Sequence, residues 1–366
     1  MKTESARTQL VSVLLEPRTA LDLNAREWNN LLRRTGKHGL IARLGVSLAD
    51  HGLLKRLPGK VQARLRAACI AAESNQTAVR FELNRLLRAL AGADVPVILL
   101  KGAAYLMAGL PPSRGRYVGD LDLLVPAARI GEVEQTLIAR GWSLGDMEEY
   151  DLRYYRQWMH EIPPLQHPER ETPIDLHHTI LPLTARAHPD AAALLAASLP
   201  LADPRLRVLA PADMVLHSAV HLFNDEVGKP LRDLFDLHDL LRYFGAHDGF
   251  WDELLRRAHL HGLERPLYYT LRETRRLLGT PWPAHVEKAV AAFAPSPSIA
   301  PLMSWLFREH FEPEPPETRR LTAVADFALY LRSHWLRMPM PMLMRHLSIK
   351  AVMRMRERFA RRPAAE

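Results

Sequence analysis

The sequence predicts an α+β protein in which a small β-sheet lies between two long helical regions. Residues 61–91 contain no Pro or Gly, and their apolar side chains recur at the three- and four-residue spacing of an α-helix. Short apolar runs rich in β-branched residues, which are typical of buried strands, begin at Val95. From about residue 187 the spacing becomes helical again. Strands confined to the middle of the chain predict a single sheet packed against helices from both ends.

These changes of pattern divide the chain into four expected parts. A helical region covers residues 1–92, and an α/β core that contains the sheet covers residues 93–186. A helical domain expected to close over the core follows at residues 187–310, and a basic, Met-rich helical tail occupies residues 311–366. The sequence Glu-Pro-Glu-Pro-Pro at residues 312–316 predicts a rigid connector before that tail.

Turn and breaker residues give the expected limits of the individual elements. Pro126 closes one strand, and Gly141 stands where helices commonly end. In the core, strands are expected at residues 95–100, 118–125, 154–158 and 172–178, and helices at residues 103–110 and 127–140. The C-terminal helices are expected at residues 210–223, 231–244, 251–261, 267–278, 283–293, 298–310 and 319–336.

Two aspartates stand within one of the apolar strands. Asp120 and Asp122 are two residues apart, and alternation along a strand places such residues on the same face. Two carboxylates on a buried strand repel each other and resist burial, so a cation between them is expected. Mg²⁺ suits this place because it takes hard oxygen ligands and leaves positions for phosphate oxygens. The same pair on an exposed edge strand would need no cation, but the apolar run from Leu121 to Val125 indicates a buried strand.

A phosphate site is indicated where the first strand ends. Lys101 and Gly102 follow the strand, and Ala103 begins the next helix. Free backbone N–H groups at the start of a helix bind phosphate, and Gly allows the phosphate to come close to the backbone. Lys101 would add a positive charge. A plain strand-to-helix turn has the same pattern, so the prediction of a phosphate site here depends on the neighbouring motifs.

A third carboxylate, Asp175, lies in the apolar run Pro-Ile-Asp-Leu-His, where an unpaired charge would be costly. If its strand pairs with the strand of Asp120 and Asp122, three carboxylates converge as two-metal phosphoryl transfer requires. One ion would hold a triphosphate, and the other would lower the pKa of an acceptor hydroxyl. Asp175 could take the proton of that hydroxyl as a general base. His177 or His178 is expected to support Asp175.

Residues 95–244 resemble the DNA polymerase β-like nucleotidyltransferase superfamily, whose signature is a Gly-led helix, an Asp-x-Asp pair and a later strand Asp. The run LKGAAYLMAGLPPSRGRYVGDLDLLV is most similar to the bacterial branch of uncharacterised nucleotidyltransferase family proteins. That branch shares Lys-Gly, an Arg shortly before the Asp pair, and an Asp-Leu-His strand. The resemblance implies a minimal mixed β-sheet core with extensive helical N- and C-terminal regions, two Mg²⁺ ions, and a nucleoside triphosphate, expected to be ATP.

The resemblance also implies roles for single residues. The implied catalytic metal ligands are Asp120, Asp122 and Asp175, and the implied phosphate-binding residues are Lys101, Gly102, Ala103 and Arg116. Two features depart from the superfamily. Ala103 stands where Ser or Gly is usual, which removes one hydroxyl contact to phosphate. The segment between the glycine and the first aspartate, residues 103–119, is longer than the commonest spacing.

The expected reaction is Mg²⁺-dependent transfer of a nucleotidyl group from the triphosphate to an acceptor hydroxyl or phosphate. A catalytically weak nucleotide-binding protein with the same pocket is one alternative, consistent with the missing Gly-Ser. A metal-dependent glycosyltransferase with an Asp-x-Asp motif is another, but it would need a large α/β nucleotide domain before the motif. The acceptor stays open among protein, peptide and small molecule, and nucleic acid is not favoured.

Composition adds weaker constraints. The formal net charge of +8 suits a polyanionic partner, although an Arg-favouring genome has the same effect. The single Cys69 excludes an internal disulfide and a Cys-rich zinc site. No apolar run is long enough to span a bilayer, and the first residues lack the apolar core of a signal peptide. A cytoplasmic location is therefore expected.

Three further features have open interpretations. His217 and His221 share a helical face and would form a zinc pair, a buried pair, or part of the nucleotide cleft. Asp236 lies either near the site or on a solvated face. Residues 331–366 hold nine basic and two acidic side chains. They predict either a helix that contacts an anionic membrane or nucleic acid, or one that packs on the body through Met and Leu.

Overall fold

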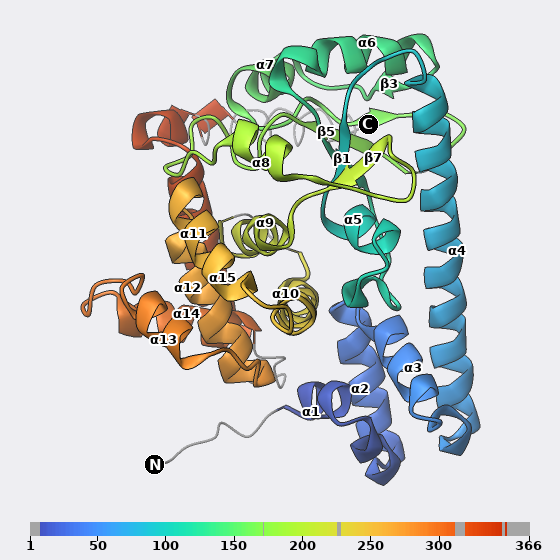
Figure 1. Ribbon diagram of the computed structural model, residues 1–366. Helices are drawn as coiled ribbons and strands as arrows, with labels where there is room; N and C mark the ends of the chain where they lie inside the picture. Colours follow the sequence, from blue (N-terminus) through green and yellow to red (C-terminus); the bar gives the residue numbers. More distant parts are fainter. Residues whose placement is uncertain (1–7, 171, 225–227, 312–318, 346–347, 350–366) are drawn as a thin grey trace, which may run out of the picture.

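A computed structural model describes residues 8–170, 172–224, 228–311, 319–345 and 348–349 (Figure 1). Within them, a seven-stranded mixed sheet has the order β3-β4-β5-β2-β1-β7-β6. Its central strand β2 is parallel to β5 and antiparallel to β1, and β1 is parallel to β7. The strands are β1 (Val97–Leu99), β2 (Leu121–Leu124), β3 (Ser143–Leu144), β4 (Leu165–Gln166), β5 (Ile174–His177), β6 (Leu199–Pro200) and β7 (Leu206–Val208). The predicted α+β class with a mixed sheet is confirmed.

Helices surround the sheet on several sides. Figure 1 shows α1 to α3 at one end of the molecule, α4 running alongside the sheet, and α9 to α15 on the opposite side. The helices before the C-terminal region are α1 (Gln9–Leu15), α2 (Ala25–Lys37), α3 (Ile41–Asp50), α4 (Gly59–Ala89), α5 (Lys101–Met107), α6 (Ile130–Ala139), α7 (Glu149–Trp158) and α8 (Ala191–Ala197). They are followed by α9 (Pro211–Asn224), α10 (Pro230–Phe244), α11 (Phe250–His261), α12 (Glu264–Glu273), α13 (Ala284–Ala291), α14 (Ala300–Phe311) and α15 (Arg319–Arg337).

One predicted strand is wrong. Residues 154–158 belong to helix α7, which begins with two acidic residues in its first turn and ends with an arginine in its last. Acidic side chains at the start of a helix and basic ones at its end interact favourably with the helix dipole. Tyr150, Tyr154 and Trp158 recur every four residues and lie ring against ring, with centroids 6.5 and 5.8 Å apart. The aromatic residues suggested β-structure, but their spacing is that of one helical face.

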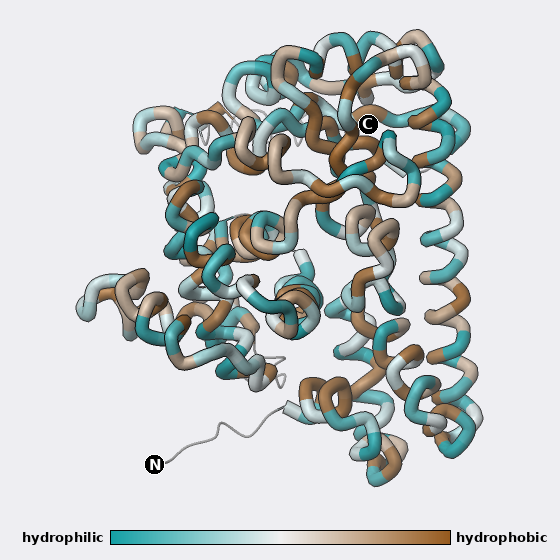
Figure 2. Tube along the Cα trace, in the orientation of Figure 1, coloured by the Kyte–Doolittle hydropathy of each residue, from teal (hydrophilic) through white to brown (hydrophobic). Residues whose placement is uncertain are grey.

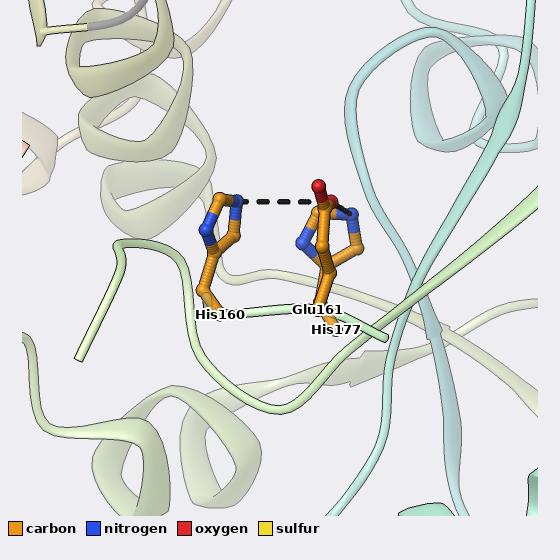
Figure 3. A group of neighbouring side chains, drawn as sticks. All are labelled: His160, Glu161 and His177. Carbon is orange, nitrogen blue, oxygen red and sulfur yellow. Dashed lines mark ion pairs between the residues drawn. The ribbon is translucent and has the colours of Figure 1, made fainter. Parts of the chain in front are cut away.

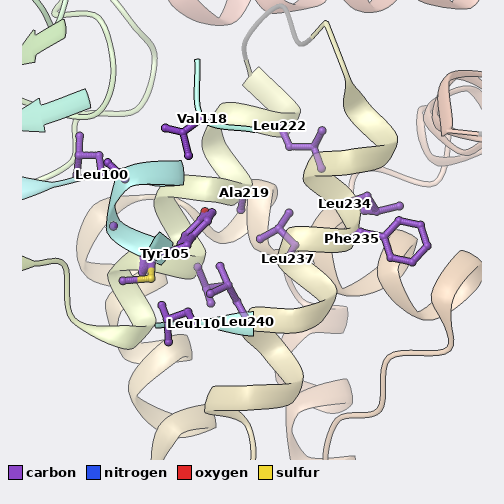
Figure 4. Close-up of a cluster of buried hydrophobic side chains, with 14 of the residues drawn as sticks. Leu100, Tyr105, Leu110, Val118, Ala219, Leu222, Leu234, Phe235, Leu237 and Leu240 are labelled. Atoms are coloured by element: carbon purple, nitrogen blue, oxygen red, sulfur yellow. The ribbon is translucent and has the colours of Figure 1, made fainter. Parts of the chain in front are cut away.

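Apolar packing fixes helix α5 against the C-terminal helices. Figure 4 shows Tyr105 of α5 beside Ala219 of α9 and Leu237 and Leu240 of α10. All four residues belong to one cluster of buried side chains that extends from Leu10 to Ala325. The hydropathy colouring shows the same apolar interior between sheet and helices (Figure 2). The start of α5 and the middle of α9 are therefore held in place by the core.

Helix α4 holds the loop that precedes the aspartate pair. Asn75 forms two hydrogen bonds with the backbone of Val118, donating at 2.9 Å and accepting at 2.8 Å. Gln76 donates to the backbone oxygens of Ser113 and Arg116, at 2.7 and 3.0 Å. Gly115 has a φ of +67°, and a Cβ there would lie 2.6 Å from the backbone nitrogen of Arg43 on α3. Only glycine satisfies both conditions.

The described part of the tail packs on the body. Helix α15 lies beside α14 and α9, and Met338 and Leu343 are buried whereas Met340 and Met344 are exposed. Leu331 and Trp335 of α15 are exposed too, so the described part of the tail buries some of its apolar side chains and leaves others at the surface. The expected connector at residues 312–316 and all basic residues beyond 349 lie outside the described residues. None of the described helices is long and apolar enough to cross a membrane.

Candidate active site

Three carboxylates meet at one edge of strands β2 and β5. The parallel register places Asp122 directly beside Asp175, and Asp120 immediately precedes β2. Each of the three offers an oxygen, and these oxygens all lie within 4.8 Å of one another. The expected convergence of the two strands is confirmed, and with it the proximity of the three side chains. Their role as metal ligands stays a prediction.

The electrostatics of the three carboxyl groups differ. The negative charge of Asp122, together with burial, raises the pKa of Asp120. Burial and the charges of Asp122 and Glu161 raise the pKa of Asp175 to about 7. Burial opposes ionisation of Asp122 as well, but Lys101 and His177 hold its pKa well below the usual range. An added positive charge would therefore favour the ionised forms of Asp120 and Asp175.

Lys101 lies at the junction of β1 and α5, where the sequence indicated a phosphate site. Its φ of +45° is the only positive value of a non-glycine residue in the described part of the chain. Such backbone strain is costly and is often found at functional sites. The ammonium nitrogen Nζ lies 2.8 Å from Oδ1 of Asp122. Lys101 therefore supplies positive charge to the carboxylates in this conformation.

Gly102 and Ala103 are both buried at the start of α5. A Cβ added at Gly102 would lie 3.1 Å from Nε of Arg116 and 3.3 Å from both Cγ atoms of Val118. The glycine is needed so that the loop carrying Arg116 can lie against the helix. The side chain of Ala103 is 1% exposed and belongs to the core, so any contact of this residue with a ligand would come from its backbone.

Arg116 is directed toward helix α10. Its guanidinium forms an ion pair with Asp236, lies 3.8 Å from Asp233, and stands 5.5 Å from the centre of the Tyr105 ring. From the sequence, Arg116 was expected to contact phosphate, and Asp236 was expected either near the site or on a solvated face. The structure places Asp236 against Arg116, where it is buried. The charge of Arg116 is thus balanced by α10 in this conformation.

His177 joins the aspartates to a fourth carboxylate. Its Nε2 lies 3.1 Å from Oδ1 of Asp122 and 3.3 Å from Oε2 of Glu161, and the ring is fully buried. Glu161 pairs with His177 across an isolated bridge, and Figure 3 shows both beside His160. The bonds to Asp122 and Glu161 outweigh burial and raise the pKa of His177. His178 bonds instead to the backbone of Met159. His177 thus supports Asp122, whereas support of Asp175 was expected.

Sequence reasoning missed Glu161 and His160. They stand alone in an irregular segment before β4, and no spacing pattern connects them with β5. Together with His177 they form a second group whose ligand atoms lie within 4.8 Å of one another. Nε2 of His177 is hydrogen bonded to Asp122 at 3.1 Å and forms an ion pair with Glu161 at 3.3 Å. His177 therefore fixes the orientation of Asp122.

The family model of uncharacterised nucleotidyltransferases matches residues 24–279. The chain belongs to this family. The match extends beyond the resemblance noted at residues 95–244, because it begins in α2 and ends after α12. A search of curated proteins found no match. The protein is accordingly a nucleotidyltransferase, an enzyme that transfers phosphorus-containing groups.

In this nucleotidyltransferase, helix α9 covers the site with two histidines. Burial and the positive charges of Lys101 and His177 lower the pKa of His217 well below its usual value. The charge of His221 partly offsets the rise in the pKa of Asp120 that Asp122 and burial cause. Among the described residues neither histidine belongs to a group that could hold a metal ion. Both histidines interact electrostatically with residues of the candidate site, and their part in a nucleotide cleft stays a prediction.

Proposed function

We propose that this protein is a Mg²⁺-dependent enzyme that transfers a nucleotidyl group from a nucleoside triphosphate, expected to be ATP, to an acceptor hydroxyl or phosphate. The observation that carries the proposal is the pairing of Asp122 with Asp175 on adjacent parallel strands, with Asp120 beside them. Family membership supports nucleotidyl transfer in general. A cytoplasmic location is part of the same proposal.

The donor set fits Mg²⁺. It consists of carboxylate oxygens, the hard ligands that this ion prefers. Oδ1 of Asp175 is buried without a hydrogen-bond partner among the described residues, and the pKa values of Asp120 and Asp175 are raised by neighbouring negative charge. A bound cation relieves both conditions. Mg²⁺ would supply positive charge for the triphosphate and would lower the pKa of the acceptor hydroxyl.

The residues of the site would divide the remaining tasks. Asp120, Asp122 and Asp175 would hold the two expected ions, and His177 would keep Asp122 in position. Lys101 would contact the phosphates, since its ammonium group already lies among the carboxylates. The carboxylate of Asp175 would take the proton of the acceptor hydroxyl as a general base.

Gly102, Ala103 and Arg116 are proposed to bind the phosphates, and for Arg116 this requires a change of ion-pair partner. The phosphate would bind to backbone N–H groups at the start of α5, where Gly102 and Ala103 are buried. Arg116 would have to exchange its pairing with Asp236 for a phosphate contact. A buried Arg–carboxylate pair is costly to break unless another anion replaces the carboxylate.

That pairing of Arg116 favours one second candidate, a catalytically weak nucleotide-binding protein. Such a protein would bind the triphosphate with Mg²⁺ and leave it intact. The glycosyltransferase alternative has no comparable support, because the described residues before β1 form helices α1 to α4 and contain no nucleotide domain.

The proposed reaction is tested with triphosphates that carry a label on the α-phosphate. Each triphosphate is incubated with the protein, Mg²⁺ and separate pools of protein, peptide, small-molecule and RNA acceptors, and the protein itself is examined for label. Asp122→Asn is compared with Asp146→Asn, which changes an exposed residue after β3. We expect transfer by the wild type and Asp146→Asn but not by Asp122→Asn. Mg²⁺-dependent binding without transfer to any pool would support the second candidate.

A further inference from the structure

A basic pocket of about 480 Å³ includes Asn224 at the end of α9, the helix that also carries His217 and His221. It is formed by the segment after β5, the end of α9, the junction of α11 and α12, and α15, which lie together in Figure 1. Arg186, Arg265, Arg332 and Arg337 line it, and none of its described lining residues is Asp or Glu. We call these four residues and the space between them the arginine pocket.

Neutral groups hold two of these arginines in place. The guanidinium of Arg186 lies 3.8 Å from the centre of the Trp335 ring, and its Nε donates to the Trp335 carbonyl at 3.1 Å. Arg332 donates to the carbonyl of Phe223 at 2.5 Å and lies 5.4 Å from the Tyr269 ring. Burial and the charge of Arg265 lower the pKa of Arg332. These contacts order the side chains but do not balance their charge.

Other arginines of the same region are balanced by carboxylates. Arg257 pairs with Asp213, Arg276 pairs with Glu273 at 2.7 Å, and Arg256 pairs with Glu253 at 2.6 Å. By contrast, no carboxylate partner is found for Arg186, Arg265 or Arg332 among the described residues. The three arginines of the pocket therefore differ in this respect from the three paired arginines just named.

Three histidines line the pocket, His188, His259 and His261, and the last two have carboxylate neighbours. His259 pairs with Glu264 at 2.9 Å, and His261 lies 3.4 Å from Asp213. An anion would therefore be held mainly by the arginines. Three unbalanced guanidinium groups exceed the single charge of one carboxylate and suit the two charges and several oxygens of a phosphate. A volume of 480 Å³ also leaves room for the molecule that carries the phosphate.

The arginine pocket continues from the face of α9 that covers the carboxylates. His217, His221 and Asn224 follow one another at intervals of four and three residues, so they lie on one face of the helix. His221 acts on Asp120, and Asn224 lines the pocket. Three residues of helix correspond to about 4.5 Å along its axis. A molecule held in the pocket could therefore extend to the carboxylates.

We infer that the arginine pocket binds a phosphate group of the acceptor, so that the acceptor of the transfer is a phosphorylated small molecule. The identification of the bound molecule as the acceptor rests on the proposed function. Phosphate binding by the arginine pocket does not depend on that function. Arg332 and Arg337 of the basic C-terminal region would then contribute to phosphate binding.

The first test measures binding of inorganic phosphate and pyrophosphate to the full chain by calorimetry, with EDTA present so that no metal bridges them to the carboxylates. Arg186→Gln and Arg265→Gln each remove one charge from the pocket, and Arg256→Gln removes one exposed charge outside it. We expect the two pocket variants to bind about tenfold more weakly and the control to stay within about twofold. Equal affinities of all four proteins, or equally tight binding of malonate, would overturn the assignment to phosphate.

The second test distinguishes the acceptor from the triphosphate. The affinity for ATP with Mg²⁺ is measured for the wild type and for the double variant Arg186→Gln, Arg265→Gln. We expect a difference of no more than about twofold, and a loss of about tenfold would show that the pocket holds the triphosphate instead. Failure of the wild type to bind ATP would contradict the proposed function and leave phosphate binding by the pocket unaffected.

Discussion

The pKa of Asp175 makes Mg²⁺ binding depend on pH. In the metal-free protein this pKa is about 7, because burial and neighbouring carboxylates disfavour the ionised form. The proton and the cation compete for the same oxygens, so binding weakens as the pH falls through 7. With a single group of pKa 7, about half of the protein carries the proton at pH 7 and about nine tenths at pH 6. The apparent affinity is therefore expected to fall about tenfold between pH 8 and pH 6.

Calorimetry of Mg²⁺ binding without nucleotide measures this effect. Titrations at pH 6, 7 and 8 give the affinity, and repetition in buffers of different ionisation enthalpy gives the number of protons released. We expect release of about 0.9 proton at pH 6, 0.5 at pH 7 and 0.1 at pH 8. Asp175→Asn should bind more weakly and lose most of the pH dependence in this interval. An affinity that is the same at pH 6 and pH 8, with no proton released at pH 6, would refute the reasoning.

Three further predictions concern stability. His177→Phe removes the donor shared by two carboxylates and should lower the free energy of unfolding by about 2 kcal/mol in denaturant titrations; a change below about 0.5 kcal/mol would argue against the shared bond. Gly102→Ala places a methyl group 3.1 Å from Arg116 and should cost about 1–3 kcal/mol, whereas Gly131→Ala in α6, with nothing within 4 Å, should cost nothing. Equal melting temperatures for these two variants would be incompatible with the close packing. Burial, and then neighbouring positive charge, lower the pKa of His38 to about 4. The free energy of unfolding therefore decreases as the pH falls from 6.5 toward 4. Relative to the wild type, the free energy of unfolding of His38→Gln should rise by about 2 kcal/mol between pH 7.5 and pH 5. No change in the difference between the two proteins over this interval would contradict the assignment.

The sequence predicted the central strands because their signals are local. Asp120 and Asp122 stand in a run of apolar residues that allows only a buried strand, and Asp175 stands in a second run of the same kind. Their convergence needed one further condition, the pairing of β2 with β5, which followed from the resemblance and is present in the sheet. The edge strands β3 and β6 and their neighbours β4 and β7 have only two or three residues, which is too short to show alternation.

Long-range contacts could not be predicted from spacing. Glu161 reaches His177 because an irregular segment runs antiparallel to β5, and nothing in the segment itself indicates this. Arg116 was expected on phosphate, yet its direction is set by two carboxylates more than one hundred residues later, Asp233 and Asp236. The strand predicted at residues 154–158 failed because aromatic residues favour both β-structure and a packed helical face.

The most direct test of the account is the binding of ATP with Mg²⁺ to Asp122→Asn. Calorimetric titrations compare the wild type, this variant and Asp146→Asn, after thermal unfolding has shown that all three are folded. The account predicts that EDTA abolishes binding to the wild type, that Asp146→Asn binds as the wild type does, and that Asp122→Asn binds at least about tenfold more weakly. Binding of ATP by Asp122→Asn with wild-type affinity and the same dependence on Mg²⁺ would contradict it.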